Sequence, residues 1–285
     1  MPGQVISIII PAYNEADRIG AQLEALATQT DAADCEVVVA DNGSRDGTAA
    51  VVAAWADRLP VRVVDASARR GAAAARNLAA DAARGDLLVF VDADDVVMPG
   101  FVAAWRALPS DVEFAAGPVT FFAADAAPPA DGAAAAPVLP TQMGFLPYAL
   151  GANLAVRRAA LDRVGAFDET YRAAEDVELS WRLQLAGVPL VLEAGAVVAK
   201  REAAGFTATV RQYYAYGRRD PFLYREYRAH GVPGPRWPAV LRAYGGLVVR
   251  LALLWRREDR RRFAHQLGRR AGRIAGSAAA RVLYP

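Results

Sequence analysis

The chain has 285 residues, of which 54% are hydrophobic and 22% are charged, and its net charge is +2. This composition is ordinary for a globular protein, and the length suffices for one large core or for one domain with an appendage. The single cysteine, Cys35, excludes an internal disulfide and fits a reducing compartment. The N-terminus lacks the basic region of a signal peptide, and no stretch approaches the roughly 18 apolar residues of a spanning helix. We therefore expect neither a secreted disulfide framework nor a membrane-spanning segment.

The small net charge hides an uneven distribution. Residues 1–199 carry 14 basic and 26 acidic side chains, whereas residues 200–285 carry 19 basic and 5 acidic ones. An acidic body is thus followed by a basic tail. Such asymmetry indicates an anionic partner for the tail, either a membrane or a nucleic acid.

In the first third of the chain, apolar strands alternate with helices. Continuous β-branched runs predict strands at 5–13 (VISIIIPAY), 35–41 (CEVVVAD), 61–66 (VRVVDA) and 86–95 (DLLVFVDADD). Helical spacing of apolar residues and alanine-rich stretches predict helices at 14–29, 48–59 and 69–85. This alternation predicts an α/β fold in which a parallel sheet is covered by helices on both faces.

The later elements are less regular. Residues 123–140 are rich in alanine and proline, and we expect a mobile loop there. From about Phe206 the chain should be mostly helical, with a break at residues 230–238 (HGVPGPRWP). Between these regions we predict a strand with a short helix, a further helix and the last strands, at 151–169, 175–187 and 188–200.

Polar residues gather where such a sheet places its binding site. Ligands of open α/β sheets bind at the carboxyl ends of the strands, and the predicted strands end in PAYNE, ADNGS and DADD. The last of these puts Asp92, Asp94 and Asp95 within four residues. Like charges this close resist ionisation unless a cation or hydrogen-bond donors lie nearby. These residues alone are compatible with two interpretations, a solvated acidic turn and a metal site.

Four stretches stand in one order along the chain: SIIIPAYNEADRI, VVVADNGSRDGTA, RRGAAAARNLAADAARGDLLVFVDADD and GAFDETYRAAEDVELSWRLQLAG. Together they resemble the family 2 glycosyltransferases of the GT-A fold, over roughly residues 4–217. The resemblance implies a Rossmann-like, mostly parallel sheet and an inverting enzyme that uses a nucleotide-diphospho-sugar donor. It also implies a divalent metal, Mn²⁺ or Mg²⁺, which as a Lewis acid neutralises charge on the leaving diphosphate.

The run Asp92-Ala93-Asp94 matches the DxD motif of that family. Because side chains alternate along an extended segment, the two aspartates lie on the same side of the chain. By resemblance, Asp94 binds the metal, and Asp92 binds the ribose or reaches the metal through water. The role of Asp95 stays open.

The resemblance also implies a nucleotide-sugar site at these strand ends. Tyr13 can offer a ring face and a hydroxyl group to the nucleoside, and Asp41 accepts a hydrogen bond from the base. Arg76 either reaches the ribose or diphosphate or is a solvated helix charge. Asn153, near the donor sugar, and Arg182, near the acceptor or diphosphate, are weaker candidates. The other residues assigned to this site are Pro11, Glu15, Asn42, Gly43 and Ser44.

The acceptor hydroxyl group needs a general base within hydrogen-bond reach. Glu175 and Asp176 match the acidic pair that the family carries at a helix start. The resemblance implies that Asp176 is the base, with Glu175 as the alternative. Carboxylates also interact favourably with the N-terminal end of a helix dipole, so helix capping is the competing interpretation.

The sequence departs from the family pattern in the segment VVAKRE. Many relatives carry a metal-binding histidine there, whereas this chain has Lys200, its only lysine beside 32 arginines. A protonated lysine cannot bind a metal, but its ammonium group can contact a diphosphate as a point charge. Three interpretations stay open. The metal has fewer protein ligands than in those relatives, or the ammonium group of Lys200 supplies part of the positive charge at the diphosphate, or Lys200 is a surface residue.

The tail predicts amphipathic helices. Its apolar residues recur at three- and four-residue spacing: Trp237, Leu241, Tyr244, Leu247, Val248, Leu251 and Trp255. With clustered arginines, this pattern suits a helix in the plane of an anionic membrane. Packing on the catalytic domain, or on a second copy in a homodimer, is the alternative. We divide the chain into a catalytic domain, residues 1–217, and a helical basic C-terminal extension, residues 218–285.

The favoured interpretation is a cytoplasmic enzyme, peripheral on the inner face of the cell membrane, that glycosylates a lipid-linked or cell-envelope glycan. A sugar-nucleotide nucleotidyltransferase would need a glycine-rich basic loop after the first strand, and PAYNEADR is not one. The alternative of another class is a non-enzymatic module that binds membrane or nucleic acid. Because no stacking platform or nucleic-acid module is recognisable, we expect no nucleic-acid partner. Donor, acceptor and linkage stay open.

Overall fold

The computed structural model describes residues 5–30, 35–129, 138–251 and 257–285. The chain divides into two compact units. Unit 1 comprises Met1–Phe122, Ala126–Pro140 and Leu146–Glu202, and unit 2 comprises Ala123–Asp125, Thr141–Phe145 and Ala203–Pro285.

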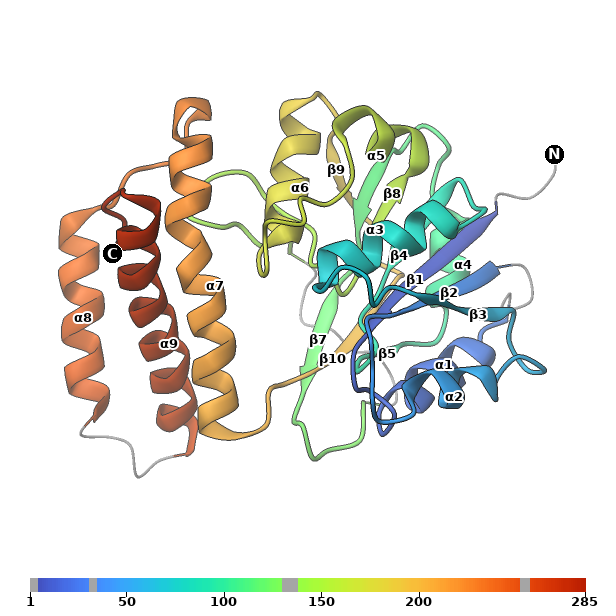
Figure 1. Cartoon of the computed structure of the whole chain (residues 1–285). Helices are drawn as coiled ribbons and strands as arrows, with labels where there is room; N and C mark the ends of the chain where they lie inside the picture. Colours follow the sequence, from blue (N-terminus) through green and yellow to red (C-terminus); the bar gives the residue numbers. More distant parts are fainter. Residues whose placement is uncertain (1–4, 31–34, 130–137, 252–256) are drawn as a thin grey trace. The chain divides into compact units, whose positions relative to one another are not determined.

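A seven-stranded sheet forms the centre of unit 1, in the order β3-β2-β1-β4-β8-β6-β9 (Figure 1). Its strands are β1 (Ile6–Ala12), β2 (Cys35–Asp41), β3 (Val61–Asp65), β4 (Leu87–Phe90), β6 (Phe114–Ala116), β8 (Leu154–Arg157) and β9 (Leu190–Leu192). β1 pairs in parallel with β2 and β4, and β2 with β3, whereas β8 runs antiparallel to both of its neighbours. The predicted α/β class with a mostly parallel sheet is confirmed.

Helices cover both faces of this sheet because its strands are apolar on both. One set of strand residues, including Ile8 and Ile10, packs with α1 (Ile19–Ala27), α2 (Thr48–Ala53) and α4 (Phe101–Arg106). The alternate set, including Ile9 and Val38, packs with α3 (Ala72–Ala82), α5 (Arg158–Val164) and α6 (Glu175–Leu185). Successive residues of a strand thus serve opposite layers, as the two-residue period of a strand requires.

A second, three-stranded sheet was not anticipated from the sequence, which gave no element between residues 96 and 122. It consists of β5 (Val96–Val97), β7 (Val119–Phe122) and β10 (Val198–Arg201), with β10 in the middle. β10 runs antiparallel to β5 and parallel to β7. This pairing brings the end of β10 beside the acidic segment that follows β4.

The loop predicted at 123–140 is described only in part, because residues 130–137 lie outside the described residues. The parts on either side, 123–129 and 138–140, contain no helix or strand. Whether this loop is mobile therefore stays a prediction.

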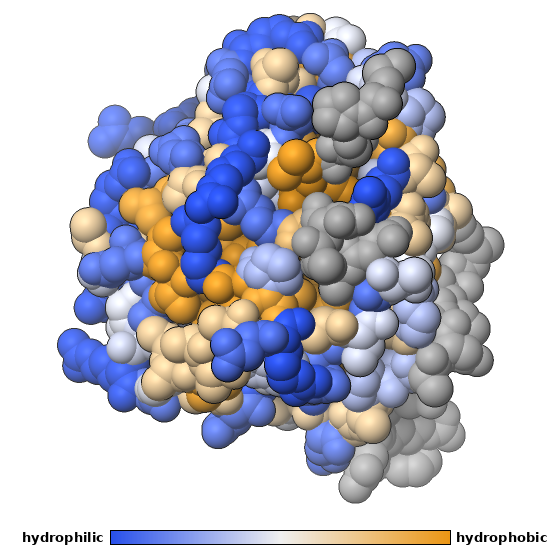
Figure 2. Space-filling model, turned by 90° about the vertical axis from the view of Figure 1, so that its right-hand side faces the viewer, coloured by the Kyte–Doolittle hydropathy of each residue, from blue (hydrophilic) through white to orange (hydrophobic). Residues whose placement is uncertain are grey.

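Figure 2 shows the side of unit 1 from which β1 starts, opposite the carboxyl ends of the parallel strands. Apolar side chains gather near the middle of this face, and hydrophilic ones surround them. This face is thus mixed, with both apolar and hydrophilic side chains.

Unit 2 is helical, as the sequence predicted. It contains α7 (Gly205–Tyr227), α8 (Trp237–Leu251) and α9 (Arg257–Ala280), with the expected break between α7 and α8. α7 runs without interruption through residue 217, where the sequence analysis placed the boundary, so this unit begins earlier, at Ala203. Trp255 lies outside the described residues. In the described part of the chain, no helix combines the length and apolarity needed to cross a membrane.

Glycines let α7 and α9 approach each other closely. Gly268, Gly272 and Gly276 recur every fourth residue of α9 and thus share one face. A Cβ atom at Gly272 would collide with the backbone carbonyl oxygen of Tyr214, and one at Gly276 with that of Arg218. Since backbone atoms cannot move aside as a flexible side chain can, only glycine fits at these contacts.

Two glycine-to-alanine substitutions in unit 2 should therefore have opposite effects. Gly272→Ala is expected to lower the free energy of unfolding by about 1–3 kcal/mol, the usual range for overpacking. Gly246→Ala in α8, where nothing lies within 4 Å of the added Cβ, should raise it by about 1 kcal/mol through helix propensity. Urea unfolding of both variants measures the difference. A gain of stability in both would contradict the close packing of α7 on α9.

Candidate active site

A cavity of about 410 Å³ lies at the carboxyl edge of the large sheet in unit 1. It is bounded by the loops that follow β1, β2 and β4 and by the start of α3. Its lining includes six residues that the sequence analysis assigned to the site: Pro11, Tyr13, Glu15, Asn42, Asp92 and Asp94. The parallel strands thus bring three segments that are distant in the sequence to one place.

Hydrogen bonds between the loops after β1 and β2 fix one side of this cavity. Asn14, whose φ is 55°, donates its backbone N–H to Ser44 Oγ at 2.9 Å, and Asn14 Oδ1 accepts the N–H of Arg45 at 2.9 Å. Asp41 Oδ1 accepts the N–H of Ser44 at 3.0 Å. Tyr13, beside Asn14, is 51% exposed and lines the cavity. Its ring is therefore accessible on a well-anchored loop.

Asn42 organises the loop that precedes α3. Its Nδ2 donates to the carbonyl oxygens of Ala66 at 2.7 Å and Arg69 at 2.8 Å, and its Oδ1 accepts the N–H of Gly71 at 2.8 Å. Gly43 follows with a φ of 84°, a conformation that glycine adopts readily. Asn42 thus uses its amide group to shape the cavity wall.

The carboxylate of Asp92 lies between two cations. Arg76 Nη2 donates to Asp92 Oδ1 at 2.8 Å, and Lys200 Nζ donates to Asp92 Oδ2 at 2.8 Å. Burial alone would raise the pKa of Asp92, but Lys200 and Arg76 outweigh that effect and hold the pKa well below its ordinary value. Asp92 is therefore ionised, and both of its oxygen atoms already accept a charged donor.

Lys200 connects β10 to the segment after β4. Its Nζ also donates to Asp95 Oδ2 at 3.0 Å, and Asp95 Oδ1 accepts the N–H of Arg201 at 2.9 Å. Asp95 is fully buried, and this burial raises its pKa to about 7. Of the three interpretations of Lys200, the free surface lysine is thus wrong. Asp95, whose role the sequence left open, helps to hold the ammonium group.

Asp94 differs from both of its acidic neighbours. It lines the cavity, and no side chain among the described residues donates a hydrogen bond to its carboxylate. Burial raises the pKa of Asp94, Lys200 offsets part of that rise, and Asp92 adds to it. A partly buried carboxylate without its own cationic partner is suited to bind a cation from solution.

The described residues contain no group of three His, Cys, Asp or Glu side chains that could hold a metal ion by themselves. A metal at Asp94 would therefore take most of its ligands from elsewhere. Mg²⁺ is commonly bound in this way, by one or two carboxylates with water and substrate phosphates. The donor set fits a metal ion that binds together with a diphosphate, and does not fit a closed protein cage.

The acidic pair Glu175 and Asp176 begins α6, as predicted. Glu175 Oε1 accepts a hydrogen bond from Arg76 Nη1 at 2.6 Å, so one buried guanidinium group joins this pair to Asp92. Asp176 Oδ2 accepts the N–H of Gly151 at 2.8 Å, and Oδ1 accepts the N–H of the next residue at 2.8 Å. The second of these contacts lies in the first helical turn, where a capping residue would act.

The environment of Asp176 increases its affinity for a proton. Burial, followed by the charge of Glu175, raises the pKa of Asp176 to about 6. At neutral pH the carboxylate is ionised but is a stronger base than an exposed aspartate. These properties suit general-base chemistry.

Two weaker candidates have their polar groups engaged elsewhere. Arg182 forms an ion pair with Glu178 at 2.7 Å and donates to carbonyl oxygens at the end of α5, including that of Gly165 at 2.8 Å. Asn153 is fully buried, and its Nδ2 donates to two backbone carbonyl oxygens at 2.7 and 3.0 Å. Neither residue lines the cavity. Their contacts with donor or acceptor stay predictions, and the contacts that the structure shows for both residues are with the protein itself.

Gln22 of α1 supports the site and was missed in the sequence. It is fully buried, its Nε2 donates to the carbonyl oxygen of Asp92 at 3.3 Å, and its Oε1 accepts the N–H of Val97 at 2.9 Å. It lies three residues after Ile19, on the apolar face of the helix. A polar residue at such a core position is the signal that could have revealed it. Gln22 holds the backbone of the acidic segment in place.

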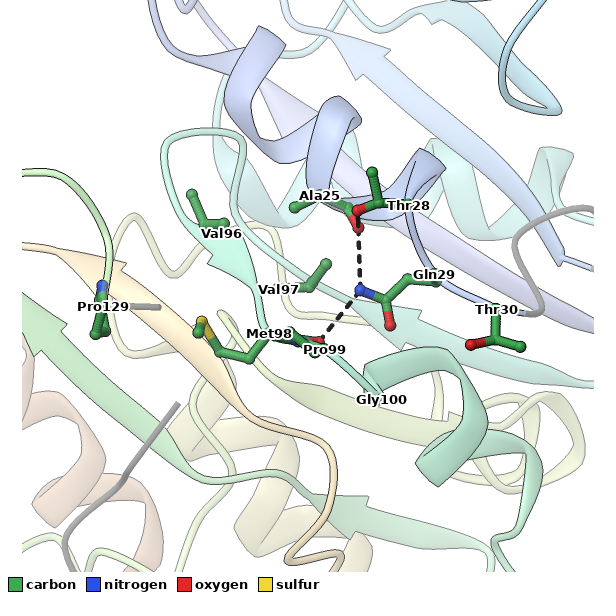
Figure 3. A pocket seen from close by; sticks show the side chains of 10 residues that line it. All are labelled: Ala25, Thr28, Gln29, Thr30, Val96, Val97, Met98, Pro99, Gly100 and Pro129. Atoms are coloured by element: carbon green, nitrogen blue, oxygen red, sulfur yellow. Dashed lines mark hydrogen bonds between the residues drawn. The ribbon is translucent and has the colours of Figure 1, made fainter. Parts of the chain in front are cut away.

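A second cavity in unit 1, of about 270 Å³, contains no titratable side chain (Figure 3). It lies between the end of α1 and the segment from β5 to α4. Gln29 points into this region, and its Nε2 donates to the carbonyl oxygens of Ala25 at 3.0 Å and Met98 at 3.2 Å. Because no acid or base lies beside its two threonine hydroxyl groups to activate them, this cavity is no candidate for catalysis.

Replacement of Arg76 should destabilise unit 1. Its guanidinium group is 5% exposed and pairs with Asp92 and Glu175. Because Arg76→Gln removes the charge that balances two carboxylates, we expect the free energy of unfolding to fall by about 3 kcal/mol or more. Arg45→Gln, at an exposed position, is the matched control and should change it by less than about 0.5 kcal/mol. Thermal unfolding measures both, and equal shifts would show that the buried pairs are unimportant.

Comparison with known proteins adds independent information. Residues 7–129 match the family model described as Glycosyl transferase family 2. The validoxylamine A glucosyltransferase of Streptomyces hygroscopicus subsp. jinggangensis is 32% identical over 235 residues, covering 67% of this chain and 55% of that protein. The succinoglycan biosynthesis protein ExoU of Rhizobium meliloti is 34% identical over 192 residues, covering 61% and 55%. The chain thus spans about half the length of these two relatives. The matches support a family 2 glycosyltransferase.

Similarity to two solved structures shows the fold of this chain. The mannosyltransferase PcManGT from Pyrobaculum calidifontis, in complex with GDP-Man and Mn²⁺, superposes with a TM-score of 0.64 at 21% identity, covering 96% of this chain and 87% of that one. Residues 1–349 of Staphylococcus aureus TarS, in complex with UDP-GlcNAc, give a TM-score of 0.55 at 22% identity, covering 76% and 65%. The predicted GT-A fold with a helical C-terminal region is confirmed.

Proposed function

We propose that this chain is an inverting glycosyltransferase of family 2, which moves a sugar from a nucleotide-diphosphate donor to a hydroxyl group of an acceptor. The observation that carries the proposal is the double ion pair of Arg76, which links Asp92 of the cavity to Glu175 of the acidic pair. Asp92 of the cavity and Glu175, the neighbour of the proposed base Asp176, are thereby held together by one buried guanidinium group. Preorganised charge of this kind is a main source of catalysis in group transfer.

The donor nucleotide occupies the 410 Å³ cavity in this proposal. The exposed ring of Tyr13 contacts the nucleoside, and the neighbouring Pro11 and Glu15 complete that wall. The turn of Asp41 and Ser44 lies beside it. The cavity volume falls within the roughly 300–1,000 Å³ range of small-molecule sites.

A divalent metal, Mn²⁺ or Mg²⁺, would be held by Asp94 together with oxygen atoms of the donor diphosphate. When bound, the metal neutralises charge that develops on the leaving diphosphate. Lys200 supplies a second positive charge, which Asp92 and Asp95 hold in a fixed position. The first two aspartates of the DADD segment thus have different roles: Asp92 orients the cations of the protein, and Asp94 receives the cation that comes with the donor.

Asp176 acts as the general base in this proposal. It takes the proton of the acceptor hydroxyl group while that oxygen attacks the anomeric carbon of the sugar and the bond to the diphosphate breaks. A single displacement from the opposite side inverts the configuration. The backbone N–H groups of Gly151 and Val177 orient the carboxylate, and Glu175 is fixed by Arg76.

A donor screen tests the proposed activity. The protein is incubated with UDP-, GDP- and dTDP-sugars and with Mn²⁺ or Mg²⁺, and release of nucleoside diphosphate is measured. We expect release from one nucleotide class, dependent on the metal and abolished by EDTA. If no nucleotide sugar binds in calorimetry or releases diphosphate with any of these metals, the proposed activity is wrong.

We further propose that the acceptor is a lipid-linked or cell-envelope glycan, reached by a protein that lies peripherally on the cytoplasmic face of the membrane. The support is α8, whose apolar residues Leu241, Val248 and Val249 are 64–71% exposed. Arginines occur on the same helix, at positions 242 and 250. This combination suits insertion of an apolar face below anionic headgroups.

Substitutions on the apolar face of α8 test the membrane contact. Leu241→Glu combined with Val248→Glu should lower the fraction bound to phosphatidylglycerol vesicles by about tenfold or more, since both apolar and electrostatic attraction are reduced. Ala278→Glu with Ala279→Glu, at exposed positions of α9, makes the same charge change and is the control. Equal losses would show a purely electrostatic contact. Dissociation of a dimer in sedimentation would show instead that α8 packs on a second copy.

A further inference from the structure

Unit 2 contains a cavity of about 330 Å³ that the proposed transfer reaction does not use. It lies between the segment that leads into α8, the second half of α9 and the C-terminal residues. Its polar lining is dominated by Arg236, Arg270 and Arg273, with Tyr284 beside them. The volume is at the lower end of the roughly 300–1,000 Å³ found for small-molecule sites. A single small ligand with one compact headgroup fits this space.

Positive charge exceeds negative charge around this cavity. Asp220, fully buried in α7, is held by Arg273 Nε at 2.6 Å, by Arg269 Nε at 3.1 Å and by Gln142 Nε2 at 2.7 Å. This carboxylate is therefore already shared by two guanidinium groups. The remaining positive charge is left for a ligand.

Arg270 is the residue that best suits this cavity to an anion. Among the described residues, its guanidinium group has no hydrogen bond or ion pair, and it lies 5.7 Å from the ring centre of Tyr244. Burial lowers the pKa of Arg270, and the neighbouring Arg273 lowers it further. The hydroxyl group of Tyr244 is buried and has no hydrogen-bond partner in the described part of the chain. A half-buried cation and an unused donor thus lie side by side.

We propose that this cavity binds a phosphate ester group. Guanidinium groups present paired N–H donors that match phosphate oxygens, and such charge-assisted hydrogen bonds are among the strongest in proteins. A phosphate ester carries up to two negative charges and so balances the excess of Arg236, Arg270 and Arg273 better than a single carboxylate does. The phosphate belongs either to a lipid headgroup or to a soluble phosphorylated molecule, since both present the same group.

Calorimetric titration of the full chain with glycerol 3-phosphate tests the site without a membrane. Arg270→Gln is the test variant, because it removes a guanidinium group without breaking the ion pairs of Asp220. Arg211→Gln is the control, an equal charge change at an exposed position of α7 that does not line the cavity. Arg270→Gln should weaken binding roughly 10- to 100-fold, the range for lost hydrogen bonds to charged groups, and Arg211→Gln by less than about twofold. Circular dichroism confirms that both variants are folded.

Vesicle flotation separates the two sources of phosphate. Vesicles of phosphatidylcholine with phosphatidic acid are compared with vesicles in which phosphatidylglycerol supplies the negative charge. If the site takes lipid headgroups, phosphatidic acid is preferred and Arg270→Gln removes the preference. If it takes soluble ligands, glycerol 3-phosphate binds and the preference is absent. The proposal is overturned if neither probe binds, or if Arg270→Gln and Arg211→Gln weaken binding equally.

Discussion

Asp176→Asn is expected to lower the rate of sugar transfer by roughly 10²–10⁴-fold, the usual contribution of general-base catalysis. The amide keeps the size of the side chain and can still accept the N–H of Gly151, which now donates to Asp176 Oδ2 at 2.8 Å. It cannot take a proton. Donor affinity should stay within about threefold, because the donor is bound by other residues. Steady-state rates and calorimetric donor titration on one preparation measure both quantities.

The pH dependence gives an independent test of the same residue. With the pKa of Asp176 raised to about 6, the carboxylate is protonated below that pH, and the transfer rate should fall about tenfold for each further pH unit. Asp176→Asn should remove this limb of the profile. Glu175→Gln should keep the limb but shift it to lower pH, because the charge of Glu175 contributes to the raised pKa of Asp176. If Glu175→Gln loses the limb and Asp176→Asn keeps it, Glu175 is the base.

The stability of the Asp176→Asn variant distinguishes a catalytic role of Asp176 from a role in helix capping. A carboxyl group whose folded pKa is raised stabilises the folded state at low pH, and this contribution is lost as the pH rises through about 6. Above that pH, ionised Asp176 therefore does not favour folding, and Asp176→Asn should leave the melting temperature at pH 8 unchanged or higher. A capping role predicts instead a loss of about 1 kcal/mol with turnover per folded molecule intact.

Asp94→Asn is expected to abolish the increase in nucleotide affinity that Mn²⁺ produces. Asp94 is the cavity-lining carboxylate to which no described side chain donates a hydrogen bond, and a neutral amide is a much weaker ligand for a hard cation. In the parent protein, calorimetric titration with UDP or GDP should show tighter binding with Mn²⁺ than with EDTA. In the variant the two titrations should coincide.

Asp57→Asn provides the control for Asp94→Asn, since it removes the same charge from an exposed position of unit 1. It should leave the metal-dependent increase intact. The melting temperature of Asp94→Asn should not fall, because burial of an unpaired carboxylate gives the protein no stability at neutral pH. An unchanged response to Mn²⁺ in Asp94→Asn would remove this residue from the metal site.

The carboxyl edge of the sheet could be predicted because its signals are local. At least three apolar residues stand directly before each of Pro11, Asp41 and Asp92, and polar residues follow each run. Parallel strands then place those residues at one edge, whatever the details of the connections. The cavity found there contains six of the predicted residues.

The partners within the site could not be read in the same way. Arg76 and Glu175 are separated by 99 residues, and Lys200 and Asp95 by 105. Nothing local distinguishes Arg76, which joins two acidic segments, from Arg182, which caps the end of α5. Which arginine pairs with Asp92 and Glu175 depends on how the helices pack on the sheet, and no local pattern in the sequence predicts that packing.

The close contact of α7 with α9 limits which helices of unit 2 can be replaced by the corresponding helices of a related protein. A chimera that imports α9 alone would place side chains where Gly268, Gly272 and Gly276 now meet backbone carbonyl groups of α7. A relative from which this segment is taken must therefore supply both helices together, or must itself have glycine at these three positions. The intervening α8 makes no comparable approach at Gly245 and Gly246, so this backbone constraint does not apply there. Exchange of α7 and α9 together is thus expected to preserve folding of unit 2, whereas exchange of α9 alone is not.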